Sequence, residues 1–193
     1  MFEKLKSRIE KDTPVDDSLV MTLIDNGQIL NIRKGELLVT FGTLDDNVYF
    51  VANGGFLMSI ITDEGIEKTT MFYLDDYSDL IICMDSYNLQ IPTIYQVRAA
   101  EDSFVIKFSR KFIRKLLVDD AQFALYYIIE LENMLANTSE ICDARLSSSA
   151  LNFLKLLYER YPLFFQHFTS QVIAEFMGIT PVWLSNLKRK LFI

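Results

Sequence analysis

Residues 169–190 read TSQVIAEFMGITPVWLSNLKRK, the pattern of two short helices joined at a glycine. Thr169 or Ser170 can cap the first helix, after which apolar residues recur at helical spacing. Gly178 can end that helix, because glycine accepts the left-handed conformation found at helix C-termini. Thr180 can then cap a second helix. This arrangement predicts a helix-turn-helix, a motif whose second helix enters the DNA major groove.

The second helix of this motif would bury Leu184 and Leu187 against the first helix and leave a polar outer face. Pro181 suits its first position, where no backbone N–H is needed. The residues expected to contact DNA lie on this face, on the turn and at the start of the first helix: Ser170, Gln171, Thr180, Pro181, Val182, Ser185, Asn186, Lys188 and Arg189. A surface helical hairpin that binds no DNA is the alternative, since short helix pairs are common in proteins.

Charge is distributed unevenly along the chain and favours the DNA-binding interpretation. Residues 143–193 hold six basic and three acidic side chains, which gives a formal charge of +3. The whole chain carries −7, so residues 1–142 carry −10. A basic end on an acidic protein is typical of a nucleic-acid-binding module.

Composition excludes several classes of protein. Half of the 193 residues are hydrophobic, enough for one large domain or two small ones. No apolar run approaches the ~18 residues that cross a bilayer, and no signal-peptide core is present, so we expect a cytoplasmic protein without membrane contacts. Cys83 and Cys142 lack paired spacing, and His167 is the only histidine. We therefore expect no disulfide, metal site, cofactor or catalytic residue.

The N-terminal part changes from a helical to a β-rich pattern near residue 28. Residues 1–26 have helical periodicity, interrupted at Pro14. Short β-rich runs separated by turn residues follow at 29–32, 37–41, 48–52, 56–62, 69–74, 93–99 and 103–108. Strands at this spacing, with no helices between them, predict a β-roll, that is, a double-stranded β-helix of the jelly-roll kind.

Helical periodicity returns at Ser109 and continues to residue 141. Six positions along it step by four and three residues, the spacing of a coiled-coil seam: Ala124, Ile128, Leu131, Leu135, Thr138 and Cys142. We interpret this stripe as a dimer helix, and the alternative is that it only covers the β-roll. A polar link at 143–149, a helix at 150–161 and an aromatic run at 163–168 then lead into the helix-turn-helix.

Together these patterns predict an α+β protein in three parts. Residues 1–115 form a β-roll sensor domain, 116–142 a long connecting helix, and 143–193 an all-α helix-turn-helix domain. An effector pocket in the roll would be lined by apolar and aromatic side chains: Leu57, Met58, Phe72, Tyr73, Leu80, Ile82 and Tyr95. Ordinary core packing is the alternative explanation for these side chains.

Several short segments carry a resemblance to a known family: KGE at 34–36, DDNVYFV at 45–51 followed by the glycines at 54–55, YP at 161–162, IAEFMGITP at 173–181 and LS at 184–185. With the predicted β-roll, long helix and helix-turn-helix, they resemble the Crp/Fnr family of bacterial transcription regulators, the cyclic-AMP receptor protein class. The resemblance covers nearly the whole chain. It implies a cyclic-nucleotide-binding-like domain and a homodimer that binds double-stranded promoter DNA at a two-fold symmetric site, with recognition helices about one DNA turn apart.

The chain departs from this family where cyclic nucleotides bind. Members that bind them hold the cyclic phosphate with backbone amides and an arginine. The corresponding stretch here runs from Tyr77 to Thr93, and no arginine lies between Asp75 and Thr93. A buried phosphate with no cation nearby would be uncompensated charge, so the chain argues against cyclic AMP as effector. Arg98 follows on the next strand, where a solvent-facing role is the simpler explanation.

The recognition helix departs from the family prototype as well. Pro181 and Val182 occupy the positions of its base-reading arginine and glutamate, and Asn186 that of its second arginine. Asn186 can bond adenine with two hydrogen bonds and Val182 can contact a thymine methyl, which favours an A·T-containing half-site. The basic residues 188–190 would contact phosphates. The sequence ends at Ile193, so we expect no wing hairpin after this helix.

Three functional hypotheses remain open. The first is a homodimeric regulator whose β-roll senses an unidentified effector and moves the long helix. The second is a ligand-independent β-roll that dimerises or contacts another protein such as RNA polymerase. The third is a cupin-type enzyme, which would need a histidine cluster or a carboxylate pair at the mouth of the roll. A solvated turn explains the acidic cluster there, Asp75, Asp76 and Asp79, so we expect no enzyme.

Overall fold

The N-terminal segment forms two short helices in the computed structural model, which describes residues 1–75 and 77–191. Helix α1 spans Phe2–Glu10 and helix α2 spans Asp17–Asn26. Pro14 lies in the connection between them. Asp16 caps α2, because its Oδ1 accepts a 2.7 Å hydrogen bond from the Leu19 amide. The predicted interruption of the N-terminal helical segment is confirmed.

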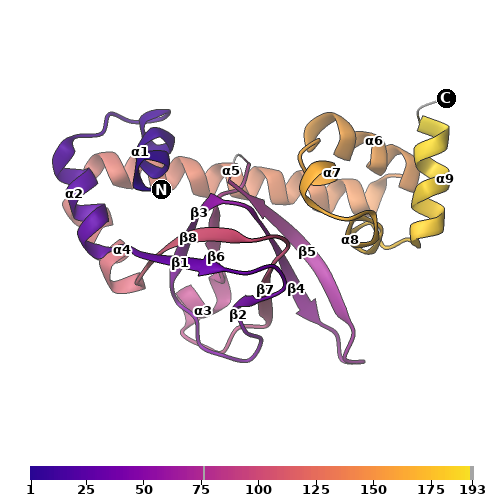
Figure 1. The fold of residues 1–193 in the computed structure, drawn as a ribbon, viewed down its shortest axis with the longest axis horizontal. Helices are drawn as coiled ribbons and strands as arrows, with labels where there is room; N and C mark the ends of the chain where they lie inside the picture. The colour runs from indigo at the N-terminus through magenta and orange to yellow at the C-terminus, as the bar shows by residue number, and fades with distance from the viewer. Residues whose placement is uncertain (76, 192–193) are drawn as a thin grey trace.

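A β-roll of two antiparallel sheets follows. Among the described residues its strands are β1 (Gln28–Ile32), β2 (Leu37–Val39), β3 (Val48–Asn53), β4 (Gly55–Ile61), β5 (Glu67–Leu74), β6 (Leu80–Ile82), β7 (Tyr95–Ala99) and β8 (Ser103–Phe108). One sheet has the order β1-β8-β3-β6 and the other β2-β7-β4-β5 (Figure 1). The predicted α+β fold with an N-terminal roll is confirmed.

Two elements of the roll, β6 and the short helix α3 (Met84–Leu89), have no counterpart among the elements predicted from the sequence. Strand β6 is buried on both faces, so its three residues lack the alternation that marks a half-buried strand. Helix α3 has six residues, too few for a clear helical period.

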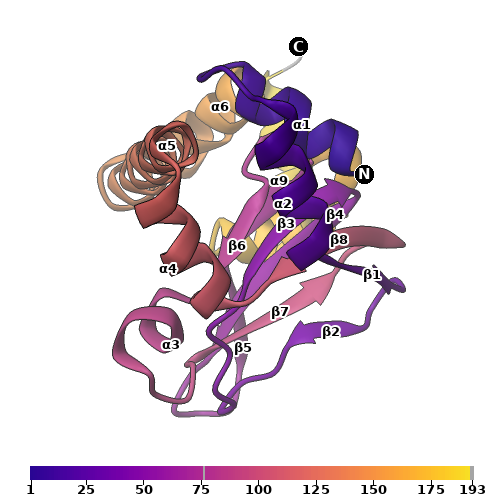
Figure 2. The ribbon, with the colours of Figure 1, turned by 90° about the vertical axis from the view of Figure 1, so that its left-hand side faces the viewer.

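Side chains alternate between the two faces along the central strands β3 and β8, so their apolar residues enter two different parts of the core. Val51 and Val105 point between the two sheets, into the interior core of the roll. Phe50 and Ile106 point to the opposite face, which packs against the helices. In Figure 2, α1, α2, α4 (Arg110–Asp119) and α5 (Ala121–Ser147) lie together on one side of the roll.

Helices α4 and α5 are separated by a break at a single residue, Asp120. Its backbone amide bonds the last turn of α4, and its Oδ1 accepts a 2.8 Å hydrogen bond from the Phe123 amide of α5. Helix α5 then runs along the roll and beyond it to the C-terminal helices (Figure 1). The polar link predicted at 143–149 is wrong over most of its length, because α5 continues to Ser147. Ile141 and Ala144 are buried against the C-terminal helices while polar neighbours face outward.

Four further helices complete the described chain: α6 (Ala150–Arg160), α7 (Phe164–His167), α8 (Ser170–Phe176) and α9 (Pro181–Leu191). The aromatic run that includes Phe164 and Phe168 packs beneath α8 and α9, as predicted. Phe192 and Ile193, the last residues of the expected C-terminal domain, lie outside the described residues. Within the described ranges, none of the helices has the length and apolar content that crossing a membrane requires.

Candidate nucleic-acid interface

The first helix of the predicted motif, α8, ends in the expected turn. Gly178 has φ +70°, a conformation that favours glycine over residues with a Cβ atom. The Ile179 amide donates to the Ala174 carbonyl at 2.9 Å, a bond that spans five residues and closes the helix end. Of the two predicted caps, Thr169 is the N-cap, since its Oγ1 accepts from the Val172 amide. The N-cap and the glycine turn predicted for this stretch are therefore confirmed.

Helix α9 is held by its cap and by one buried face. Thr180 Oγ1 accepts a 3.2 Å hydrogen bond from the Trp183 amide, and Pro181 occupies the first helical position. Leu184 and Leu187 are buried where α9 meets α8 and α6. The helix is consequently fixed from one side, and its other side faces solvent at the outer end of the molecule (Figure 1).

Most of the residues predicted to contact DNA lie on accessible surface. Those that are exposed are Ser170, Gln171, Thr180, Pro181, Val182, Ser185, Asn186 and Arg189, while Lys188 is half-buried. Val182 is 72% exposed and its neighbour Trp183, which the sequence argument left out, is 50% exposed. An apolar pair this accessible at the start of a helix is available to pack against thymine methyl groups.

Two polar residues of α9 are engaged within the protein. Lys188 Nζ donates to Ser170 Oγ at 3.1 Å and lies 5.3 Å from the ring centre of Phe165. Partial burial lowers the pKa of the Lys188 ammonium. The Asn186 side-chain oxygen accepts a hydrogen bond from the Arg189 guanidinium. Lys188 therefore ties α9 to α8, and Asn186 must exchange its partner before it can bond a base.

The helix-turn-helix packs directly on the roll through an aromatic group, which we call the interdomain cluster: Phe72, Phe164, Phe168 and Phe176. Phe72 comes from β5 and is fully buried. Its ring centre lies 4.3 Å from that of Phe168 and 4.6 Å from those of Phe164 and Phe176. Aromatic contacts of this kind add to the free energy gained by burial alone.

Polar contacts flank the interdomain cluster. Glu175 Oε1 of α8 accepts a 3.3 Å hydrogen bond from the Thr69 amide of β5. His167 Nδ1 lies 2.7 Å from Glu101 Oε1 in the loop before β8. The roll thus sets the position of α8, and through α8 that of α9.

Helix α5 has one face on the roll and one in solvent. Phe123, Tyr126 and Tyr127 are buried against the sheet side of the helix. Of the predicted seam, Ile128, Leu135 and Cys142 are exposed, while Ala124, Leu131 and Thr138 are partly buried. The exposed apolar stripe comprises Leu125, Ile128, Leu135, Cys142 and Leu146, and two of these five, Leu125 and Leu146, are absent from the predicted seam. These positions also step by four, three and seven residues, the spacing of a coiled-coil face.

This architecture is similar to that of several proteins of known structure. No protein-family model and no curated protein matches the sequence. The c-di-GMP-responsive global regulator CLP of Xanthomonas campestris matches over 91% of each chain, with 15% identity and a TM-score of 0.71. A CooA variant from Carboxydothermus hydrogenoformans matches 88% of this chain and 78% of its own, with 17% identity and a TM-score of 0.71. FixK2 from Bradyrhizobium japonicum matches 86% and 84%, with 17% identity and a TM-score of 0.68.

All three are Crp/Fnr regulators, not enzymes. This chain has the Crp/Fnr fold. The similarity extends from the roll through the long helix to the helix-turn-helix, as the sequence resemblance implied.

Within this Crp/Fnr fold, the residues predicted to line an effector pocket do not share one space. Three lie in or against the interior core of the roll: Met58, Tyr73 and Tyr95. Two face the C-terminal helices: Leu57 and Phe72. Two face α1 and α5: Leu80 and Ile82. The predicted set contained strand neighbours, and neighbours on a strand point to opposite faces of the sheet.

The segment that corresponds to the family's phosphate-binding stretch is occupied by one of its own carboxylates. Asp85 Oδ2 accepts a 2.8 Å hydrogen bond from the Ile94 amide and a 3.1 Å bond from Thr93 Oγ1, and its Oδ1 accepts from the Ser86 amide at 2.7 Å. Donors that an anionic ligand would need are therefore already engaged. Arg98 bonds a loop carbonyl at 2.9 Å on the outside of the roll.

A buried group of charges joins α1, the segment before β6, and α5. Arg8 Nε donates to Asp79 Oδ2 at 3.2 Å, and Arg8 Nη2 donates to Glu130 Oε1 at 2.7 Å. The side chain of Asp79 is 1% exposed and that of Glu130 is 7% exposed. The solvated turn expected for the acidic cluster is therefore wrong at Asp79. Asp75 pairs with a lysine of α1, and Asp76 lies outside the described residues.

Burial dominates the electrostatics of this group. It raises the pKa of the Asp79 carboxyl to about 7, although Arg8 opposes the shift. Burial also raises the pKa of Glu130, again opposed by Arg8. No local signal in the sequence indicates this site, because Arg8 lies 71 residues from Asp79 and 122 from Glu130.

Proposed function

We propose that the chain is a DNA-binding transcription regulator whose helix α9 enters the major groove. The observation that carries this proposal is the exposed polar face of α9, held by a capped turn and a buried apolar face at the outer end of the molecule. The fold supports it, because the similar proteins are Crp/Fnr regulators.

Base reading in this proposal falls to the exposed residues near the start and middle of α9. Asn186 would bond an adenine through its side-chain amide once Arg189 turns to a phosphate, and Val182 with Trp183 would contact thymine methyl groups. Ser170 and Gln171 at the start of α8 would contact the sugar-phosphate backbone. We therefore expect an A·T-containing half-site.

The proposed active form is a homodimer joined along α5. The exposed stripe of α5 is the kind of surface that a second copy would cover, since Leu135 is 67% and Leu146 88% exposed. Two-fold symmetry would place the α9 helices in successive major grooves, about 34 Å apart, on a palindromic promoter site.

Regulation of the proposed activity would use an effector other than cyclic AMP, because Asp85 occupies the donors of the phosphate-binding stretch. The second candidate is a roll that binds no small molecule and acts through dimerisation or a protein contact, with RNA polymerase as one such partner. The apolar side chains packed together between the two sheets favour this candidate. Calorimetry with a metabolite panel separates the two, since only a sensor releases or absorbs heat.

Selection of binding sites from random duplex DNA tests the proposal directly. We expect enrichment of a palindromic, A·T-containing sequence at ~100 mM salt, with specific binding at least ~1,000-fold tighter than non-specific binding. Asn186→Ala should lose about 1–3 kcal/mol of discrimination at one base pair per half-site. Asn152→Ala, a matched change on exposed α6, should leave binding unchanged. If no sequence is enriched, the proposal fails.

Cross-linking at Cys142 tests the dimer. Cys142 is exposed on the stripe of α5, whereas Cys83 is buried. Oxidation of the thiols with diamide should yield a disulfide-linked dimer that reductant reverses and that Cys142→Ser abolishes. Leu135→Lys should shift the protein to a monomer in sedimentation velocity and weaken DNA binding. A wild-type chain that sediments as a monomer at micromolar concentration, with and without DNA, contradicts the dimer.

A further inference from the structure

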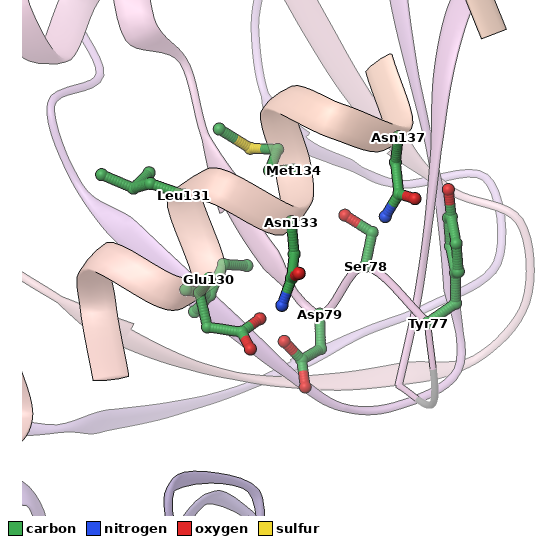
Figure 3. A pocket seen from close by; sticks show the side chains of 9 residues that line it. Tyr77, Ser78, Asp79, Glu130, Leu131, Asn133, Met134 and Asn137 are labelled. Carbon is green, nitrogen blue, oxygen red and sulfur yellow. The ribbon is translucent and has the colours of Figure 1, made fainter. Parts of the chain in front are cut away.

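The junction between the roll and α5 forms a small, partly open cavity of about 20 Å³. Residues 77–80 line one side of it, and α5 lines the other with Glu130, Asn133 and Asn137. Figure 3 shows the carboxylates of Asp79 and Glu130 and the amide nitrogen of Asn133 directed toward the same space. A cavity of this size holds one group about as large as a water molecule.

Negative charge is in excess around this cavity. Asp79 and Glu130 share the single guanidinium of Arg8. Asp12, at the end of α1, adds a further negative charge that acts on Arg8 and Glu130. A buried carboxylate that lacks a full counter-charge is costly, so the site favours one more positive charge.

A buried oxygen atom without a hydrogen-bond partner among the described residues indicates where the additional positive charge would bind. Asp79 Oδ1 is fully buried and has no hydrogen-bond partner among the described residues, although its sister oxygen bonds Arg8. The hydroxyl of Tyr126, a residue only 1% exposed, is also without a partner among them and lies among the same charges. Tyr126 does not line the cavity, so the oxygen that points to a missing partner there is Asp79 Oδ1.

We propose that this cavity binds a small monovalent cation, ammonium or an alkali ion of similar size, between Asp79 and α5. Asp79 Oδ1 supplies the charge and the Ser78 hydroxyl a neutral oxygen ligand. The side-chain carbonyls of Asn133 and Asn137 would add two more once their amide groups turn, since the Asn133 amide now donates to Glu130. Oxygen donors are the ligands that hard cations prefer. Within the described ranges no group of three acidic, histidine or cysteine side chains is placed to hold a divalent ion.

Occupancy of the site would couple three parts of the fold. The cation would bridge the segment before β6 to α5, and Arg8 already connects both to α1. Protons compete for the same position, because the pKa of Asp79 is about 7. Below that pH a proton on Asp79 supplies the positive charge, so cation binding weakens as the pH falls.

Thermal unfolding of the full chain tests this proposal without any use of DNA. The protein is kept at constant ionic strength in choline chloride at pH 8, and ammonium, potassium or sodium replaces choline. We expect each tenfold increase of the bound cation above its dissociation constant to raise the midpoint by about 3–5 °C. If only ammonium raises the midpoint, ammonium is the preferred cation. If potassium raises it as well, the site accepts both ions. Equal midpoints in all four salts would overturn the proposal.

Variants separate binding from general stability. Asp79→Asn should abolish the difference between salts, and Asn137→Ala, which leaves every charge in place, should raise the half-saturating concentration about fivefold. Glu132→Gln, on the exposed side of the same helix, is the matched control and should change neither. The rise of the unfolding midpoint that the bound cation causes should also be smaller at pH 6. If it persists there, or survives in Asn137→Ala at full strength, the cation binds elsewhere and the assignment is wrong.

Discussion

Single charges at the junction of α1 and α5 make the stability of the fold depend on pH. Arg8→Met removes the guanidinium that bonds both Asp79 and Glu130, so these two carboxylates lose that counter-charge while they stay buried. We expect a loss of about 3 kcal/mol in the free energy of unfolding at pH 8. The loss should be smaller at pH 6, because the folded variant then holds a proton on Asp79.

The sign of this pH dependence follows from the pKa of Asp79. Its folded value, about 7, lies above the unfolded value near 3.8, so the folded state binds this proton more tightly. The contribution of Asp79 to stability is therefore present at low pH and lost as the pH rises toward 7. Urea denaturation between pH 5.5 and 8 measures how the free energy of unfolding depends on pH for the wild-type chain and for Arg8→Met. Lys6→Met on the same helix serves as control, and a loss that is equal for Arg8→Met at both ends of the range contradicts the argument.

At the scale of elements, the turn between α8 and α9 depends on the conformation of one glycine. A Cβ atom at Gly178 would meet nothing within 4 Å, so Gly178→Ala carries no steric clash. Its φ of +70° still disfavours alanine, and we expect a loss of about 1 kcal/mol. Gly178→Asn should cost less, because asparagine tolerates this conformation. Denaturation midpoints check the order glycine, asparagine, alanine, and an alanine variant as stable as wild type contradicts it.

Elements whose signals are local could be predicted from the sequence. The helix-turn-helix was readable because Gly178, Thr180 and Pro181 act on their immediate neighbours. The strands with alternating patterns were also found. Strand β6 was missed because both of its faces are buried, and the end of α5 was placed too early because polar residues there occupy only its exposed face.

At the scale of the whole molecule, contacts between distant segments could not be read from the sequence. Phe72 was expected in an effector pocket, yet it lies in the interdomain cluster beneath α8. Asp79 was expected in a solvated turn, yet Arg8 meets it from α1. In both cases the residue type was informative, but the face to which it points depends on elements that lie far away in the chain.

The interdomain cluster predicts how the roll and the helix-turn-helix are coupled. Phe72→Ala removes a fully buried ring that contacts Phe164, Phe168 and Phe176, which should cost about 3–5 kcal/mol. Because those partners belong to the C-terminal helices, we expect the loss to fall on the attachment of α8 and α9. Their amides should exchange hydrogen by local opening, at lower free energy than those of β3 and β8.

Phe50→Ala provides the matched comparison for this prediction. Phe50 is buried to the same degree but faces α1 and α5 from the other sheet. Its truncation should cost a similar free energy, yet it should lower the protection of the roll and leave the difference between roll and C-terminal helices unchanged. If hydrogen exchange reports the same pattern for both variants, the cluster does not couple the two parts, and α9 would be positioned by α5 alone.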